Sequence, residues 1–462
     1  MPSESTTHHQ SKTARWVIGV GVAFVALLAS PILLLWHSSW SAGRRIDELQ
    51  NSIRAKNQPL TPEDLNDFYA APPHDKDVTQ LILAALEPLT APAFSQDAMS
   101  LPLVGNSQTP IPPPGQPWAD LDDVERFLVL YSSSLERLHE VARKNGAARF
   151  PVDFRFGSKI MLPHAQNLRS GVRMLALEAH VRAHRGDAHG TAESIQSMLA
   201  LAKSIENEPI LISQLVHIAT RRVGYSLIRD LLPHLEFSDN DLNALQKAVR
   251  DCDHRQGQHR ACIGERVLGL QSIRNPAAAG IPPGAVVVGW MAGGNEDSFC
   301  YLEMMSSLVD ATAESWTMTR SAADGVNSRI QEIASSKGGR IRHMMTMFIF
   351  PAVGPSWQAG ARGEVDQHAT DIAIAAERHR RRQGSQPADL DALVPTFLPM
   401  VPRDPFDGQP MRFRMQGEEL LIYSVGVNGI DDGGLMTVDA RGEPDIVIRL
   451  VRKATSHRQP PE

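Results

Sequence analysis

The sequence has few cysteines and no large excess of charge of either sign, and both shortages exclude classes of protein. Three cysteines among 462 residues are too few for the disulfide framework of a secreted scaffold, although one pair could oxidise outside the cytoplasm. A net charge of −6 gives no reason to expect nucleic acid as a partner.

The sequence also lacks the short motifs that would identify a reaction. No glycine-rich phosphate loop follows a predicted strand, no nucleophile elbow occurs, and no Ser/His/Asp set can be assigned. We therefore predict no catalytic residue, no organic cofactor and no small-molecule substrate. These absences favour a protein that is not an enzyme.

One long hydrophobic run is present, and it lies near the N-terminus. Residues 16–36 contain no charged side chain, and as a helix they could cross a hydrocarbon core of ~30 Å. Trp16 and Trp36 stand at the two ends, where indole rings favour the membrane interface. The run is longer than the apolar region of a signal peptide, although cleavage after Gly43 is an alternative. We predict a transmembrane helix over 16–36 and a membrane contact through this single helix.

Two arguments about the orientation of this helix in the membrane oppose each other. More basic residues follow the span than precede it, which favours a cytoplasmic C-terminal side. One N-terminal span ahead of a large domain, however, usually exports that domain whatever its charge. We expect a single-pass inner-membrane protein with its large domain in the periplasm. The basic residues are Lys12 and Arg15, then Arg44, Arg45, Arg54 and Lys56.

The helical period dominates the middle of the chain. Apolar residues over 168–179 and 192–205 form two helical stripes joined by a short turn with glycine, so these helices should pack as an antiparallel hairpin. A third helix is expected over 210–231, with Val223 among its inward residues. Two capping boxes predict helix starts, Thr61 with Asp64 and Ser238 with Asp241.

These patterns predict a mainly α protein with an N-terminal transmembrane helix, an irregular helical-hairpin bundle and a small C-terminal antiparallel β unit. The stretches 91–118 and 275–294 are rich in Pro and Gly, so we expect both to be irregular. The predicted regions are a disordered cytoplasmic tail (1–15), the transmembrane helix (16–36), short helices and a Pro-rich linker (37–118), the helical bundle (119–343), a helix plus the β unit (344–454) and a disordered tail (455–462).

Two clusters have residue types that bind zinc. His180 and His184 lie four residues apart on one helical face, with His189 following, but Val181 stands where a metalloprotease has its glutamate. Surface histidines on a helical hairpin explain this first cluster equally well and are far more common, and for the second cluster we favour a solvated helix over a metal site. The second cluster is Cys252, His254, His259 and Cys262, of which Cys252, His259 and Cys262 share one helical stripe.

The C-terminal region has an ordered series of turns and short strands. A helix is followed by a Gly-x-x-Pro turn, a Leu-Val-Pro segment, an Asp-Pro-Phe turn and a Tyr-Ser-x-Gly strand. This order resembles the C-terminal domain of type II secretion major pseudopilins. The matching residues are Gly384, Pro387, Leu393, Val394, Pro395, Leu398, Pro399, Pro402, Asp404, Pro405, Phe406, Gly408, Tyr423, Ser424, Gly426 and Gly429.

The resemblance implies a calcium site, because in pseudopilins the loop after the Tyr-Ser-x-Gly strand binds calcium. Asn428, Asp431 and Asp432 would then supply hard oxygen ligands. Bare turns would explain the same residues, and the EF-hand spacing is absent. The chain also departs from pseudopilins at its N-terminus, where the processing site and the Phe-Thr-Leu-x-Glu sequence are missing.

The N-terminal anchor, the long helical middle with "EPILISQLVHIA" and this C-terminal unit together resemble a family of uncharacterised bacterial membrane-anchored envelope proteins. No activity comes with that resemblance. Three hypotheses follow from the sequence. They are a non-enzymatic envelope scaffold that binds protein partners, an accessory component of a type II secretion or pilus-like system, and a metal-dependent hydrolase built on the His180/His184 or Cys252/Cys262 groups.

Overall fold

A computed structural model describes residues 41–276, 283–350, 356–417, 419–434 and 444–450. The predicted transmembrane helix over 16–36 and the predicted tails, 1–15 and 455–462, lie outside these residues. Within the described ranges, no helix combines the length and the apolar character that a bilayer crossing needs.

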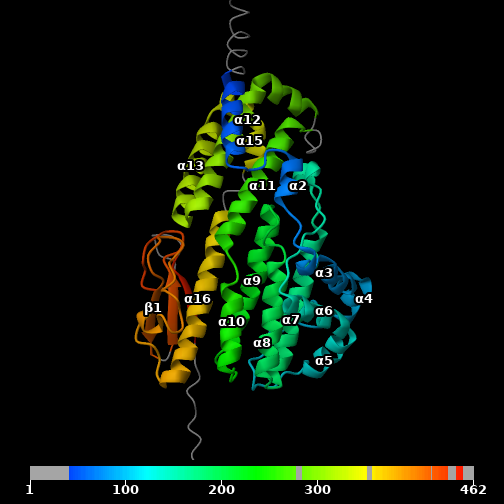
Figure 1. Ribbon diagram of the computed structural model, residues 1–462, viewed down its shortest axis with the longest axis vertical. Coiled ribbons are helices and arrows are strands. Elements are labelled where there is room, and N and C mark those ends of the chain that lie inside the picture. The colour runs from blue at the N-terminus through cyan, green and yellow to red at the C-terminus, as the bar shows by residue number, and fades with distance from the viewer. Residues whose placement is uncertain (1–40, 277–282, 351–355, 418, 435–443, 451–462) are drawn as a thin grey trace, which may run out of the picture.

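The described chain is mainly helical and ends in a three-stranded antiparallel sheet. Figure 1 shows an elongated bundle of helices with the sheet on one flank. A helix over 41–55 comes first. The later elements are α2 (Pro62–Phe68), α3 (Thr79–Leu86), α4 (Pro92–Asp97), α5 (Leu121–Leu130), α6 (Ser132–Lys144), α7 (Pro163–His184), α8 (Ala188–Lys203), α9 (Leu211–Leu231), α10 (Asp239–Arg250), α11 (His254–Arg274), α12 (Pro283–Glu314), α13 (Trp316–Ser335), α14 (Lys337–Arg342), α15 (Met344–Ile349), α16 (Ser356–Gln383), β1 (Arg412–Gln416), β2 (Glu419–Ser424) and β3 (Ile446–Leu450).

The predicted hairpin and both predicted capping boxes are confirmed. Helices α7 and α8 pack together, and Asp187 caps α8 by accepting a hydrogen bond from the Gly190 amide at 2.8 Å. The boxes at Thr61 and Ser238 begin α2 and α10. Local hydrogen bonding at helix starts was therefore readable from the sequence.

Three finer predictions are wrong. Residues 92–97 form α4 inside the stretch expected to be irregular, because Phe94 packs against Phe127 with ring centroids 5.6 Å apart. Helix α12 begins at Pro283, so much of the predicted break at 275–294 is helical. Proline is tolerated in the first turn of a helix, and the packing of α12 against α11 outweighs the low helix propensity of its Gly residues. Val223 is 41% exposed, because it falls on the outward stripe of α9.

The start of α9 is held by buried polar side chains rather than by apolar packing alone. Glu208 is fully buried and accepts hydrogen bonds from Ser213, from His164 at 2.9 Å and from Tyr69 at 3.3 Å. The Gln214 amide donates to three carbonyls, including that of Glu208 at 2.8 Å. Because buried polar groups are costly without partners, this network fixes the α8–α9 connection.

The β unit is antiparallel, as predicted. Strands β1 and β2 pair antiparallel with Arg412 opposite Tyr423, and β3 adds to the other side of β2. Gly417 makes the turn with φ +64°, a conformation that glycine adopts without strain. The sheet lies against α16 (Figure 1).

Helix α16 joins the β unit to the bundle through charged contacts. Asp366 pairs with Arg222 at 2.5 Å and with Arg229 at 3.2 Å, both on α9. Asp371 pairs with Arg250 of α10 at 2.7 Å. The Gln367 amide donates to the carbonyls of Val249 and Cys252 at 2.9 and 3.0 Å. These contacts fix α16 against α9, α10 and the α10–α11 connection.

We predict that Gly264→Ala destabilises the fold. A Cβ at this position of α11 would lie 1.7 Å from the carbonyl oxygen of Pro209, so the α8–α9 connection would have to move, at about 1–3 kcal/mol. The matched control is Gly325→Ala on α13, which meets nothing within 4 Å and should gain about 0.5–1 kcal/mol. Denaturant unfolding of both variants measures the difference, and equal stabilities would contradict the close approach.

Candidate functional site

A cleft of about 790 Å³ opens between the helical bundle and the segment that precedes β1. Its walls come from the α8–α9 and α10–α11 connections, the first turns of α11, the middle of α16 and residues 399–403. The residues that line it are Glu206, Asn207, Arg250, Asp251, Cys252, Asp253, Arg255, Gln256, Gly257, Arg260, Glu364, Gln367, His368, Asp371, Pro399, Met400, Pro402 and Arg403.

The cleft carries charges of both signs. Five carboxylates and four guanidinium groups line it, and some are already paired, such as Asp371 with Arg250 and Asp251 with Lys203 at 2.6 Å. Pockets for small apolar molecules have mainly hydrophobic walls with a few polar groups. This lining instead suits a polar ligand that has both charges.

Two of the cleft carboxyl groups have altered acidity. Burial raises the pKa of Glu206 and of Glu364 above their usual value. Glu364 also accepts a hydrogen bond from the Trp316 indole at 2.6 Å. In both groups burial favours the neutral carboxyl, and such shifts occur at functional sites as well as at structural ion pairs.

A group of metal-ligand side chains adjoins the cleft at Cys252. His217 from α9, Cys252 from the α10–α11 connection and His254 at the start of α11 place one donor atom each within 4.8 Å of one another. The His217 Nε2 atom lies 3.3 Å from the Cys252 sulfur. Among the described residues, no other set of three or more His, Cys, Asp or Glu side chains converges in this way.

The two imidazoles of this group are buried, and each is 2% exposed. His217 Nδ1 lies 2.8 Å from the Ala202 carbonyl oxygen, which requires a proton on Nδ1 and leaves the Nε2 lone pair towards Cys252. Neither ring nitrogen of His254 has a hydrogen-bond partner. Burial lowers the pKa of His217 to about 3 and that of His254 well below its usual value, so both rings are neutral.

The cysteine stands between the cleft and a buried guanidinium. Burial raises the pKa of the Cys252 thiol to about 12, against the opposing effect of Arg221. Arg221 is 1% exposed and donates to the Tyr225 hydroxyl at 2.9 Å and to the carbonyls of Ala248 and Val249 at 3.0 Å. Of the described carboxylates, none lies within ion-pair distance of Arg221.

Two residues of this group, Cys252 and His254, were predicted from the sequence as candidate metal ligands. The predicted stripe of Cys252, His259 and Cys262 is not brought together, because Cys252 precedes α11 and His259 turns to the Val309 carbonyl at 3.0 Å. Cys262 is buried beside Gln258. His217 was missed, because it lies on another helix and nothing in its spacing connects it to Cys252.

The histidines of α7 and α8 do not form a three-ligand site within the described residues. His184 Nδ1 lies 2.9 Å from the His180 carbonyl oxygen, and the His184 ring packs on Trp118 with centroids 4.9 Å apart. His189 pairs instead with Asp241 at 2.7 Å. The spacing that suits zinc therefore has another explanation here.

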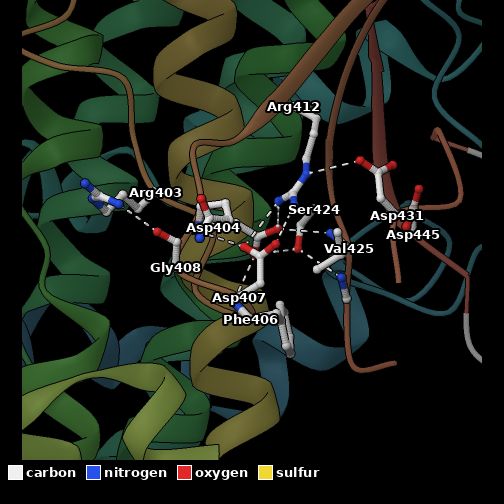
Figure 2. Close-up of polar contacts among 12 residues, drawn as sticks. Arg403, Asp404, Phe406, Asp407, Gly408, Arg412, Ser424, Val425, Asp431 and Asp445 are labelled. Carbon is white, nitrogen blue, oxygen red and sulfur yellow. Dashed lines mark hydrogen bonds and ion pairs between the residues drawn. The ribbon is translucent and has the colours of Figure 1, made fainter. Parts of the chain in front are cut away.

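The acidic C-terminal turns gather around one arginine (Figure 2). Asp404 is fully buried and accepts from Arg412 at 2.8 Å, from the Ser424 hydroxyl at 2.8 Å and from the Val425 amide at 3.0 Å. Arg412 also pairs with Asp407, and its Nε lies 3.5 Å from Asp431. Burial raises the pKa of Asp404, and these hydrogen bonds oppose that effect. The cluster joins the Asp-Pro-Phe turn to β2.

The three residues predicted to bind calcium lie in one loop after β2. Asn428 Oδ1 accepts from the Ile430 amide at 2.9 Å, and Asp431 Oδ1 accepts from the Gly433 amide at 2.9 Å. The Asn428 amide donates to Asp432 at 3.4 Å. These contacts are those of side-chain-closed turns, and the calcium role of Asn428, Asp431 and Asp432 stays a prediction.

The described residues also contain a serine, a histidine and a glutamate in the hydrogen-bond order of a catalytic triad. His139 lies 2.8 Å from the Ser197 hydroxyl and 2.9 Å from Glu178. Ser197, however, is 3% exposed in the middle of α8, where a substrate carbonyl cannot approach. The set therefore ties α6, α7 and α8 together, and it was not readable from the sequence.

Comparison with family models, with curated proteins and with solved structures finds no match for this chain. The site must therefore be interpreted from its own geometry.

We predict that Asp404→Asn destabilises the β unit by about 1.5–3 kcal/mol, the usual contribution of hydrogen bonds to a charged group, because the loss of acceptors for Arg412, Ser424 and Val425 outweighs the gain from removing a buried charge. An amide cannot accept from Arg412, Ser424 and Val425 at once. The control is Asp391→Asn at an exposed position, which should stay within about 0.5 kcal/mol of the parent. Denaturant unfolding compares them, and an unchanged Asp404→Asn variant would refute the role of this cluster.

We predict that Glu364→Gln gains stability over the parent protein as pH rises. The pKa of Glu364 is raised in the folded protein. Folding is therefore favoured most below the usual pKa of Glu, where the side chain is protonated, and this contribution to stability is lost as pH rises through the raised pKa. Glutamine keeps the neutral form at every pH, so the difference should vanish in acid and grow towards neutral pH.

The control for this titration is Glu125→Gln, which should show the opposite trend. Arg185 lowers the pKa of Glu125 through a hydrogen bond, so this variant should be less stable than the parent at neutral pH and equal to it in acid. Thermal melting from acidic to neutral pH measures both, and parallel curves for the two variants would contradict the burial effect at Glu364.

Proposed function

We propose that this chain is a membrane-anchored, non-enzymatic protein of the bacterial envelope, and that its helical body is a scaffold that presents the charged cleft to a protein partner. The observation that carries this proposal is the cleft itself, with its five carboxylates and four guanidinium groups. A partner segment with both charges could pair with these groups.

The residue types on the cleft wall support a protein partner rather than a small-molecule substrate. Met400 and Arg403 lie on the segment before β1, and Met400 is 68% exposed. Methionine and arginine are enriched at protein interfaces, because one adapts to irregular surfaces and the other pairs with carboxylates and carbonyls. Arg403 donates to the Gly408 carbonyl at 2.8 Å, which holds it at the rim.

A second surface supports the anchoring. The helix over 41–55, which follows the hydrophobic run of the sequence, lies at the same end of the molecule as α12 and α15 (Figure 1). Helix α15 carries Phe348, which is 72% exposed, and α14, which contacts α15, carries Ile341, which is 48% exposed. Lys337, Arg340 and Arg342 of α14 are also exposed. Apolar and basic side chains together suit an anionic bilayer surface.

A role in a pilus-like filament has weaker support. The order of α16 and three antiparallel strands agrees with the pseudopilin resemblance in outline. Pseudopilin-like assembly would need free helical surface, whereas α16 is covered by α9, α10 and α11 of the same chain. An accessory role in secretion would therefore have to use the cleft or the sheet.

A metal-dependent hydrolase is the second candidate, and the group of His217, Cys252 and His254 favours it. A catalytic zinc site has three protein ligands and one open position, and Cys252 lies on the cleft wall. Glu206 lines the same cleft and could act as a general base. Hydrolysis that requires both a metal and Glu206 would support this alternative.

The test of the proposed scaffold uses the full chain in its membranes. We expect it to stay with the membranes after an alkaline wash, and a photo-reactive amino acid at position 400 to cross-link to a discrete protein partner. Arg260→Glu should weaken that product, because it changes the charge of the cleft. The control position is Met161, which is 82% exposed and does not line the cleft.

Release by the alkaline wash would overturn the anchoring. Identical cross-linked products from positions 400 and 161, or a product at 400 that is unaffected by Arg260→Glu, would overturn the cleft as the binding surface.

A further inference from the structure

We propose that His217, Cys252 and His254 bind one thiophilic transition-metal ion, of the class of Zn²⁺ or Cu⁺, at the wall of the cleft. This inference goes beyond the scaffold function and does not depend on it. Thiolate and imidazole are the ligands that both ions prefer, and the three side chains come from two helices and a connection rather than from one helix.

The distances already approach those of a bound ion. With metal–sulfur and metal–nitrogen bonds of 2.3 and 2.0–2.1 Å, tetrahedral ligands lie about 3.5 Å apart. His217 Nε2 and the Cys252 sulfur are 3.3 Å apart, and the three donor atoms lie within 4.8 Å of one another. Side-chain movement of about 1.3 Å at most would therefore complete the geometry.

The hydrogen bonds around the group orient it for a metal. The Ala202 carbonyl holds the proton of His217 on Nδ1, and metal-bound histidines usually donate their other nitrogen to such an acceptor. The Cys252 carbonyl accepts from Gln367, which fixes the backbone that carries the sulfur. Two of the three ligands are thus positioned before any ion binds.

His254 provides an independent observation. Its ring is 2% exposed, yet neither nitrogen has a hydrogen-bond partner. Other buried side chains also have a polar atom without a partner, but of the described histidines only His254 has both ring nitrogens buried and unpartnered, and such atoms need an explanation. A metal ion at the neighbouring Cys252 and His217 would satisfy one of these nitrogens.

Charge also bears on the choice of ion. Binding would release the thiol proton of Cys252 to solvent and form a metal–thiolate bond. The buried guanidinium of Arg221 interacts with Cys252, so a thiolate would give it an anionic neighbour. With Cu⁺ the ion and thiolate together are neutral, whereas with Zn²⁺ they have a charge of +1 next to Arg221, which Glu206 in the cleft could offset.

The experiment measures metal content and affinity of the full chain purified in detergent. After loading with Zn²⁺ or Cu⁺ and desalting, we expect one ion per chain by atomic emission. Competition with a chromophoric chelator should show more than tenfold weaker binding in Cys252→Ser and in His254→Gln, since even outer-shell substitutions weaken metal sites by about 10–100-fold.

The control variants are Cys262→Ser and His259→Gln, the other cysteine and histidine of the same sequence cluster, and His180→Asn on α7. All three should keep the affinity of the parent protein. Retained binding in Cys252→Ser, or equal losses in the controls, would overturn the assignment of these ligands.

A spectroscopic readout keeps the proposal testable if a variant fails to fold. Co²⁺ bound to the parent protein should give a thiolate-to-cobalt charge-transfer absorption, because Cys252 would be a ligand. The lack of this absorption, with less than one tenth of an ion per chain, would overturn the site. It would also remove the hydrolase alternative, but cross-linking from position 400 would still decide the scaffold function.

Discussion

The contact on which the rest of the site depends is the polar interface of α16 with α9 and α10. Gln367 donates to the carbonyls of Val249 and Cys252, so the end of α10 and the residue that bears the thiol are fixed to one helix. Asp366 and Asp371 add ion pairs to arginines of α9 and α10. Partly buried charge pairs of this kind contribute little net stability, but they select one register of packing. That register places Cys252 next to His217 and forms one wall of the cleft.

Buried carboxylates also organise the C-terminal unit. Asp404 accepts from Arg412 of β1 and from Ser424 of β2 (Figure 2), whereas Asp366 and Asp371 of α16 accept from α9 and α10 respectively. Of the three residues that suggested a calcium loop, Asp431 lies 3.5 Å from the Arg412 guanidinium. An exposed acidic turn and a buried acidic junction have similar sequences, and only the partners distinguish them.

Local rules predicted much of the fold, and contacts between distant segments limited the prediction. The capping boxes at Thr61 and Ser238 and the antiparallel β unit follow from neighbouring residues, and they are confirmed. Helix α4 opposes its local composition and depends on the contact of Phe94 with Phe127 of α5, and α12, which begins in a stretch rich in Pro and Gly, packs against α11. The pairing of His217 with Cys252 is of the same kind, because 35 residues separate them along the chain. The sequence did indicate Cys252 and His254 as candidates, and a polar residue in the apolar "LVHIA" segment was the available signal for His217.

The packing of the helix over 41–55 limits the distance between the cleft and the membrane. Arg45 stacks over Phe299 at 3.7 Å, and Lys56 pairs with Asp310 at 2.6 Å, so this helix belongs to the rigid body and is no flexible tether. If residues 16–36 span the bilayer as proposed, only residues 37–40 separate the two, which is about 14 Å even when fully extended. The body would then stand at a nearly constant height above the lipid, and its partners would be those that present their binding segments at that height.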